Sequence, residues 1–151
     1  MIHLLDRKNR DMLEAHRVYS EAELRSRYEI MLENYCKTIT IEAHTMVSMA
    51  REEIIPAVEA YTGELARIAA AKLSVSGDIP VNYEKKQIKR LSQLTELISE
   101  NADGLDRMIS ECESTEDIGE QAKTIKEHIL AKMDELRKPC DEAEVITAGK
   151  Y

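Results

Sequence analysis

The chain has 151 residues, of which 43% are hydrophobic and 33% charged, with a formal net charge of −8 at pH 7. This length predicts a single domain over residues 1–151, and the composition excludes a disordered chain. The negative charge disfavours proteins that track nucleic-acid backbones or anionic membranes, because both need clustered basic residues.

Membrane and disulfide-rich classes are also disfavoured. No apolar run has the length of a membrane span, and the N-terminus becomes charged at Asp6 without the apolar core of a signal peptide. We therefore expect a cytoplasmic location. The three cysteines are widely spaced and form no Cys-x-x-Cys pair, which disfavours a disulfide framework or a thiolate zinc site. Cys36 and Cys112 are expected inside helices as buried residues, and Cys140 in a loop as an exposed thiol.

The scarcity of turn-forming residues predicts an all-α fold. Only five glycines and three prolines occur, and Glu, Lys, Arg, Ala and Leu are abundant. Because the chain has no Phe and no Trp, its core must consist of aliphatic side chains, methionines and a few tyrosines.

A first short helix is predicted from about Arg7 to Arg17. The next helix has a clear start, because Ser20 and Glu23 have the spacing of a capping box. Tyr19, which precedes the cap, is placed to pack on Leu24 as a hydrophobic staple.

The helix that begins at Ser20 is predicted to continue to about Leu73, a length of roughly 80 Å. Its apolar residues recur at steps of three or four and lie on one face. They are Leu24, Tyr28, Met31, Tyr35, Ile39, Ala43, Met46, Ala50, Ile54, Ala57, Tyr61, Leu65 and Ile68. Pro56 has no backbone N–H and is expected to kink the helix just before it. The β-branched run Thr38–Ile41 lowers helix propensity without ending the helix.

A turn-rich segment, Ser74–Val81, separates this helix from the next. Asn82 is the expected N-cap of a helix that runs to about Cys112. Its core positions are Leu91, Leu94, Ile98, Leu105, Met108 and Cys112. Asn101 occupies the one missing core position, where a single polar residue often fixes the register between helices.

The last helix is predicted to begin after Thr115, as N-cap, and to end at Pro139. Its apolar stripe is Ile118, Ala122, Ile125, Ile129, Met133 and Leu136. Residues 141–151 are expected to form a frayed tail. The predicted architecture is an antiparallel helical bundle, in which two helices fold back along one long Pro-kinked helix.

No catalytic motif is present. The sequence lacks the glycine-rich phosphate-binding patterns and the His-Glu-x-x-His zinc motif, and its four histidines lie far apart. Carboxylate pairs such as Glu29 with Glu33 and Glu59 with Glu64 are typical of a solvated helix face. We therefore predict no catalytic, cofactor-binding or metal-binding residue in this chain.

One fragment suggests a different chemistry. Residues 42–48, around His44, resemble the helical motif of histidine phosphotransfer domains, which are also acidic and all-helical. That motif has a Lys three positions after the histidine and then a Gly, whereas this chain has Val47 and Ser48. Without the cation that stabilises the phosphoryl group, a packing role for His44 is the stronger interpretation.

Two further features have open interpretations. Glu42 either faces solvent or forms a partly buried pair with Arg27 or Arg51. Tyr28, Tyr35 and Tyr61 lie near one helix face. Tyrosines at this spacing either edge the core or line a subunit interface, where the ring is buried and the hydroxyl stays hydrated.

The region from Ser26 to Val58, together with Tyr61, is the most distinctive part of the chain. Its characteristic residues are Arg27, Tyr28, Glu29, Tyr35, Lys37, Glu42, Met46, Pro56 and Tyr61. This run resembles the C-terminal helical region of type III glutamine synthetases, the large-subunit bacterial form. The resemblance begins around Asn9 and thins after Leu73.

The resemblance implies a parent enzyme that ligates ammonia to glutamate with ATP and magnesium or manganese, and that assembles from two stacked hexameric rings. Its ligands belong to an upstream catalytic domain, so the resemblance assigns none to this chain. It implies a structural role, with the catalytic domain of the same polypeptide and neighbouring subunits as partners. Both ends of the chain look like cuts that isolate a domain, since the Trp-Pro-rich closing segment of the family is absent.

A free-standing helical module that binds partner helices is the alternative to this interpretation. The sequence does not distinguish which surface would meet a catalytic domain or another subunit.

Overall fold

The structure is a computed structural model that describes residues 6–16 and 18–147. Its elements are α1 (Arg7–Ala15), α2 (Glu21–Met49), the π-helical turn η2 (Ala50–Ile54), α3 (Ile55–Val75), α4 (Asn82–Glu113), α5 (Ile118–Thr124), the π-helical turn η3 (Ile125–Ile129) and α6 (Leu130–Ile146). No strand occurs in the described ranges, which confirms the all-α prediction. Arg17, the predicted end of the first helix, and residues 148–151 of the predicted tail lie outside them.

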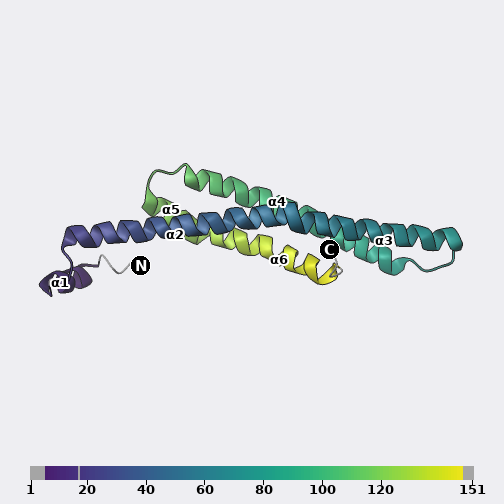
Figure 1. Cartoon of the computed structure of the whole chain (residues 1–151), viewed down its shortest axis with the longest axis horizontal. Helices are drawn as coiled ribbons and strands as arrows, with labels where there is room; N and C mark the ends of the chain where they lie inside the picture. Colours follow the sequence, from purple (N-terminus) through teal and green to yellow (C-terminus); the bar gives the residue numbers. More distant parts are fainter. Residues whose placement is uncertain (1–5, 17, 148–151) are drawn as a thin grey trace.

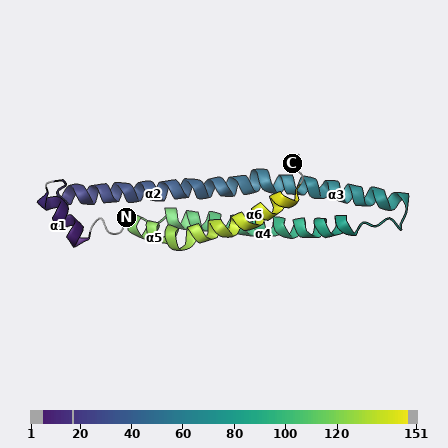
Figure 2. The same ribbon diagram turned by 90° about the horizontal axis from the view of Figure 1, so that it is seen from below.

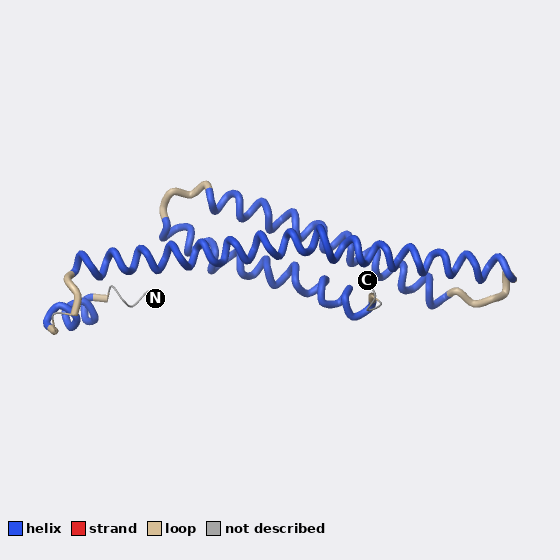
Figure 3. The backbone as a smooth tube through the Cα atoms, viewed as in Figure 1, coloured by secondary structure: helices blue, strands red, loops and turns tan. Residues whose placement is uncertain are grey.

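The bundle is elongated. α2, η2 and α3 run end to end along the whole molecule, and α4 returns beside them (Figure 1). Figure 2 shows α4, α5 and α6 on one side of this long segment. The loop before α2 and the loop between α3 and α4 lie at opposite ends of the molecule, whereas the loop between α4 and α5 lies beside α2 (Figure 3). The predicted arrangement, one long helix with others folding back along it, is therefore confirmed.

The capping box at the start of α2 is present. The backbone N–H of Glu23 donates to Ser20 Oγ at 3.3 Å, and the backbone N–H of Ser20 donates to Glu23 Oε2 at 2.8 Å. These bonds satisfy donors that the first helical turn otherwise leaves unpaired. They also lower the pKa of the Glu23 carboxyl group.

Pro56 lies in the first turn of α3, directly after η2. A proline cannot donate to the carbonyl four residues earlier, and the wider π-helical turn accommodates that missing bond. The interruption predicted before Pro56 therefore takes the form of a π-helical turn, and helical structure continues from Glu21 to Val75.

The buried face of the long segment differs from the predicted one at several positions. Met31 and Ile68 are exposed, whereas their neighbours Leu32 and Ala69 are buried. The same one-residue displacement gives buried Cys36, Val47 and Val58 in place of Tyr35, Met46 and Ala57. Apolar residues occupy adjacent positions here, so the packing of α4, α5 and α6 decides which of them is covered.

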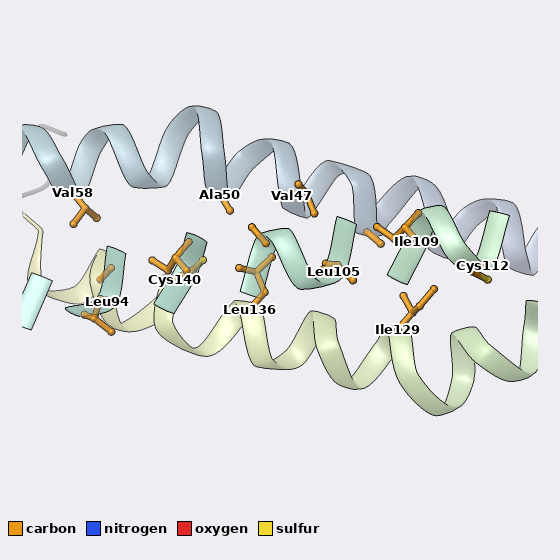
Figure 4. Close-up of a cluster of buried hydrophobic side chains, with 14 of the residues drawn as sticks. Val47, Ala50, Val58, Leu94, Leu105, Ile109, Cys112, Ile129, Leu136 and Cys140 are labelled. Carbon is orange, nitrogen blue, oxygen red and sulfur yellow. The ribbon is translucent and has the colours of Figure 1, made fainter. Parts of the chain in front are cut away.

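α4 supplies the largest part of the core, which it shares with the long segment and α6 (Figure 4). Its fully enclosed side chains include Leu91, Leu94, Ile98, Leu105 and Ile109. Asn101 is buried among them, and its Oδ1 accepts a hydrogen bond from Lys132 Nζ of α6 at 2.8 Å. The predicted polar core position therefore links two helices.

Two predicted helix caps are wrong. Asn82 is the first helical residue of α4, after Val81 at the N-cap, and no side chain caps this end. α5 is capped by Asp117 instead of Thr115. Asp117 Oδ1 accepts from the backbone N–H groups of Gly119 at 2.7 Å and Glu120 at 2.9 Å. An ionised carboxylate at this end also interacts favourably with the helix dipole.

The predicted end of the last helix at Pro139 is also wrong. α6 passes through Pro139 and continues to Ile146, so residues 141–146 are helical and not a frayed tail. Pro139, Cys140 and Ala143 are buried, and this burial favours helical structure beyond the proline. The prediction of an exposed thiol at Cys140 therefore fails, and burial raises the pKa of that thiol to about 11.

Candidate functional site

The residues that carry the family resemblance lie along the long segment and do not converge on one point. Glu29, Lys37, Glu42 and Pro56 are exposed. Tyr28, Tyr35, Met46 and Tyr61 are half-buried, and the last three pack against the core. The four half-buried residues are therefore the ones whose side chains can both pack on the bundle and form part of its surface.

Tyr28 and Tyr35 line a cavity of about 500 Å³ between α2 and the α5–η3 segment. We call this cavity the tyrosine pocket. Its walls are Tyr28, Leu32 and Tyr35 from α2, with Gly119, Ala122, Lys123, Lys126 and Glu127 opposite. Mostly apolar walls with a few polar groups at the rim are typical of binding clefts in proteins.

Local interactions hold the far wall of the pocket in place. The Cys36 thiol donates to the carbonyl of Ile118 at 4.0 Å, and the Cys112 thiol donates to the carbonyl of Gln121 at 3.7 Å. Burial raises the pKa of both thiols, which keeps them protonated donors. Together with the Asp117 cap, these contacts fix the first turns of α5 against α2 and α4.

The π-helical turn η3 completes this wall. It buries Ile125 and Ile129 in the core while Lys126 and Glu127 remain at the rim. Lys123 and Lys126 are exposed and make no ion pair among the described residues. With Glu127 the rim carries a net positive charge, in contrast to the net charge of −8 of the chain.

Sequence reasoning identified Tyr28 and Tyr35 but missed the opposite wall. Lys123 and Lys126 lie about ninety residues or more further along the chain, and neither belongs to the apolar stripe of the last helix. A signal existed in Asp117, a strong N-cap residue that marks where α5 begins.

The remaining candidates have separate partners. Arg27 lies over the Tyr19 ring, with 4.6 Å between Cζ and the ring centroid, a cation–π contact. Arg51 bonds Asp103 at 2.7 Å and Asp106 at 2.9 Å, both on α4. Glu42 is exposed, so its interpretation as a partly buried partner of Arg27 or Arg51 is wrong, and it faces solvent.

His44 is half-exposed, and its Nε2 lies 3.5 Å from Glu113 Oε1. A carboxylate at this position repels a phosphoryl group, whereas phosphotransfer needs a cation. Within the described ranges, no three His, Cys, Asp or Glu side chains cluster closely enough to hold a metal ion. Across the same ranges, no helix has the length and hydropathy of a bilayer span.

Fold and surface together define a class: an elongated helical bundle domain with an apolar surface pocket between helices. Comparison with known proteins narrows this class to a family. Residues 1–72 match the family described as glutamine synthetase C-terminal domain, and this part of the chain belongs to that family.

Two relatives extend the similarity beyond that range. A glutamine synthetase of Butyrivibrio fibrisolvens is 33% identical over 144 residues, which cover 93% of this chain. A type-3 glutamine synthetase of Dictyostelium discoideum is 26% identical over an alignment of 153 positions, which includes 95% of this chain. The chain spans about one fifth of the length of each relative. The resemblance predicted from the sequence is confirmed.

Proposed function

We propose that this chain is the non-catalytic C-terminal helical domain of a larger glutamine synthetase and that it acts in subunit packing. The observation that supports this proposal best is the tyrosine pocket. Tyr28 and Tyr35, which line one of its walls, lie inside the range that matches the family. Half-buried tyrosines around an apolar cavity suit an interface, where a partner side chain fills the cavity and the hydroxyl groups stay hydrated.

The parent reaction in this proposal is the ATP-dependent ligation of ammonia to glutamate. ATP and magnesium or manganese act in the upstream catalytic domain, and this chain supplies no ligand to them. Its partners are that catalytic domain and neighbouring subunits of a homo-oligomer in the cytoplasm, without nucleic acid or membrane. The positive rim formed by Lys123 and Lys126 favours a partner surface that carries carboxylates.

The assembly role is tested in the full-length synthetase with Tyr28→Ser. This substitution removes a ring from the pocket wall and is expected to shift the assembly toward smaller species in light scattering coupled to gel filtration. Tyr83→Ser is the matched control, because Tyr83 is 61% exposed on α4 and lies outside the pocket. A Tyr28 variant that assembles like the unmodified enzyme would contradict the proposed packing role.

The absence of catalysis is tested with the chain alone. We expect no glutamine formation from glutamate, ammonium and ATP with either magnesium or manganese. Measurable turnover by the pure chain would contradict this part of the proposal, irrespective of the assembly result.

A further inference from the structure

A second apolar surface lies on the seam between the long segment and α6. Two adjoining cavities of about 250 and 310 Å³ share Met46 and Arg137 there. We call this surface the methionine groove. Its apolar lining includes Met46, Met49, Ile54, Leu130, Met133 and Leu136.

The groove is apolar and adaptable. Three of the chain's seven methionines line it, and Met49 is 45% exposed while Leu130 is 36% exposed. Methionine has a flexible, unbranched side chain, and methionine-rich surfaces are used to bind helices of varied sequence. These exposed side chains therefore offer apolar contacts to a partner.

The flank of the groove is acidic. Asp134, Asp141 and Glu144 border it on α6, at steps of seven and three residues that place them on one helix face. Arg137, the one cation among the described residues that line the groove, lies 3.5 Å from Asp141. Asp134 and Glu144 make no ion pair among the described residues. Charge complementarity therefore favours a partner with lysines or arginines beside its apolar residues.

The dimensions of the groove suit a helix. From Leu130 to Glu144, α6 rises about 21 Å, which equals about four helical turns. The chain's own α1, which is basic at Arg7, Lys8 and Arg10, cannot reach it. Met46 lies about 39 Å along the helix from Ser20, whereas the five residues 16–20 span at most about 18 Å.

We propose that the methionine groove binds an amphipathic helix of another polypeptide, with an apolar stripe flanked by lysines or arginines. Its apolar residues would contact Met46, Met49 and Met133, and its basic residues would face Asp134 and Glu144. This surface is distinct from the tyrosine pocket, so the inference holds or fails independently of the proposed function.

The test uses a fluorescent synthetic peptide of about 18 residues, with leucines at helical spacing and lysines at the other positions. We expect saturable binding in the micromolar range by fluorescence anisotropy. In NMR spectra of methyl-labelled methionines, Met46, Met49 and Met133 should shift while Met31 and Met108 stay unchanged. A matched peptide with glutamates in place of the lysines should not bind.

Paired variants separate specific binding from general attraction to an acidic protein. Asp134→Lys with Glu144→Lys should weaken binding about tenfold or more. Glu59→Lys with Glu96→Lys makes the same change in net charge at exposed positions outside the groove and should have a much smaller effect. Equal weakening by both pairs would overturn the proposal.

A second set of paired variants tests the apolar contact between the groove and the peptide. Met49→Ser with Leu130→Ser should weaken binding about tenfold, whereas Ile68→Ser with Leu97→Ser, also exposed, should not. Absence of saturable binding, or methyl shifts confined to methionines outside the groove, would also overturn the proposal.

Discussion

Glu84 is a buried carboxylate that joins the start of α4 to the end of α3. It accepts a hydrogen bond from Lys72 Nζ, and its Oε2 is enclosed without a hydrogen-bond partner in the part of the chain that the structure describes. The hydrogen bond from Lys72 lowers the pKa of Glu84. The ionised form is therefore favoured in the folded protein, and this pair fixes the geometry of the α3–α4 hairpin.

A pH dependence follows from that lowered pKa. The ionised Glu84 carboxylate stabilises the folded state through Lys72. This stabilisation is fully present above the pKa of glutamate in the unfolded chain, about 4.3, and is lost as pH falls through the lower pKa of Glu84 in the folded chain. Glu84→Gln should therefore reduce the melting temperature at pH 7, and the difference from the unmodified chain should shrink below about pH 4. Thermal melts followed by circular dichroism at a series of pH values measure this difference in melting temperature.

Glu96→Gln is the control for this experiment, because Glu96 is exposed on the same helix and forms no ion pair with any residue that the structure describes. The melting temperature of the Glu96→Gln variant should equal that of the unmodified chain at every pH. A deficit in Glu84→Gln that stays constant down to acid pH would show that Glu84 acts through packing and not through its charge.

At the scale of helices, the contact between Asn101 and Lys132 links α4 to α6. Gly104 makes room for it, since a Cβ at that position would lie 2.9 Å from Lys132 Cε. Lys132 also bonds Glu135 at 2.9 Å on its own helix. The buried amide therefore has a charged partner in one register of the two helices, and a shift of register would leave it unpaired.

A double-mutant cycle with Asn101→Ala and Lys132→Ala measures this link. We expect a coupling energy of about 1 to 2 kcal/mol, because the hydrogen bond is partly buried and involves a charged group. The exposed pair Arg137 and Asp141, 3.5 Å apart on α6, should couple by less than about 0.5 kcal/mol. Equal coupling in the two cycles, measured by urea unfolding, would refute the register role.

At the scale of the whole molecule, α4 holds the bundle together. It packs against α3, α6 and α2, and its enclosed side chains lie at the centre of the shared core. α1, by contrast, buries no residue and connects to α2 through the ion pair of Arg10 with Glu21. We therefore expect α2 to α6 to unfold as one cooperative unit.

Leu105→Ala tests this expectation. Leu105 is fully buried on the core-facing side of α4, so its truncation should lower the free energy of unfolding by about 3 kcal/mol. Leu97→Ala, on an exposed face of the same helix, should change it by less than about 0.5 kcal/mol. The loss should be the same by circular dichroism and by tyrosine fluorescence, and probes that disagree would show that the bundle unfolds in parts.

Local patterns in the sequence account for the presence of the main helices. Periodic apolar residues and scarce turn residues predict the long segment and the two returning helices, and the Ser20–Glu23 cap depends only on neighbours three residues apart. The family resemblance also drew attention to Tyr28, Tyr35 and Met46, and the structure places the two tyrosines in the tyrosine pocket and Met46 in the methionine groove.

Packing between helices sets which apolar residues are covered, allows α6 to continue through Pro139, and brings distant segments face to face. Burial of Cys140 and Ala143 acts against the local cost of a helical proline, and it depends on helices far away in sequence. The tyrosine pocket and the methionine groove likewise join residues about ninety positions apart. Local propensities predict the helices, whereas contacts between distant residues create the surfaces that bind partners.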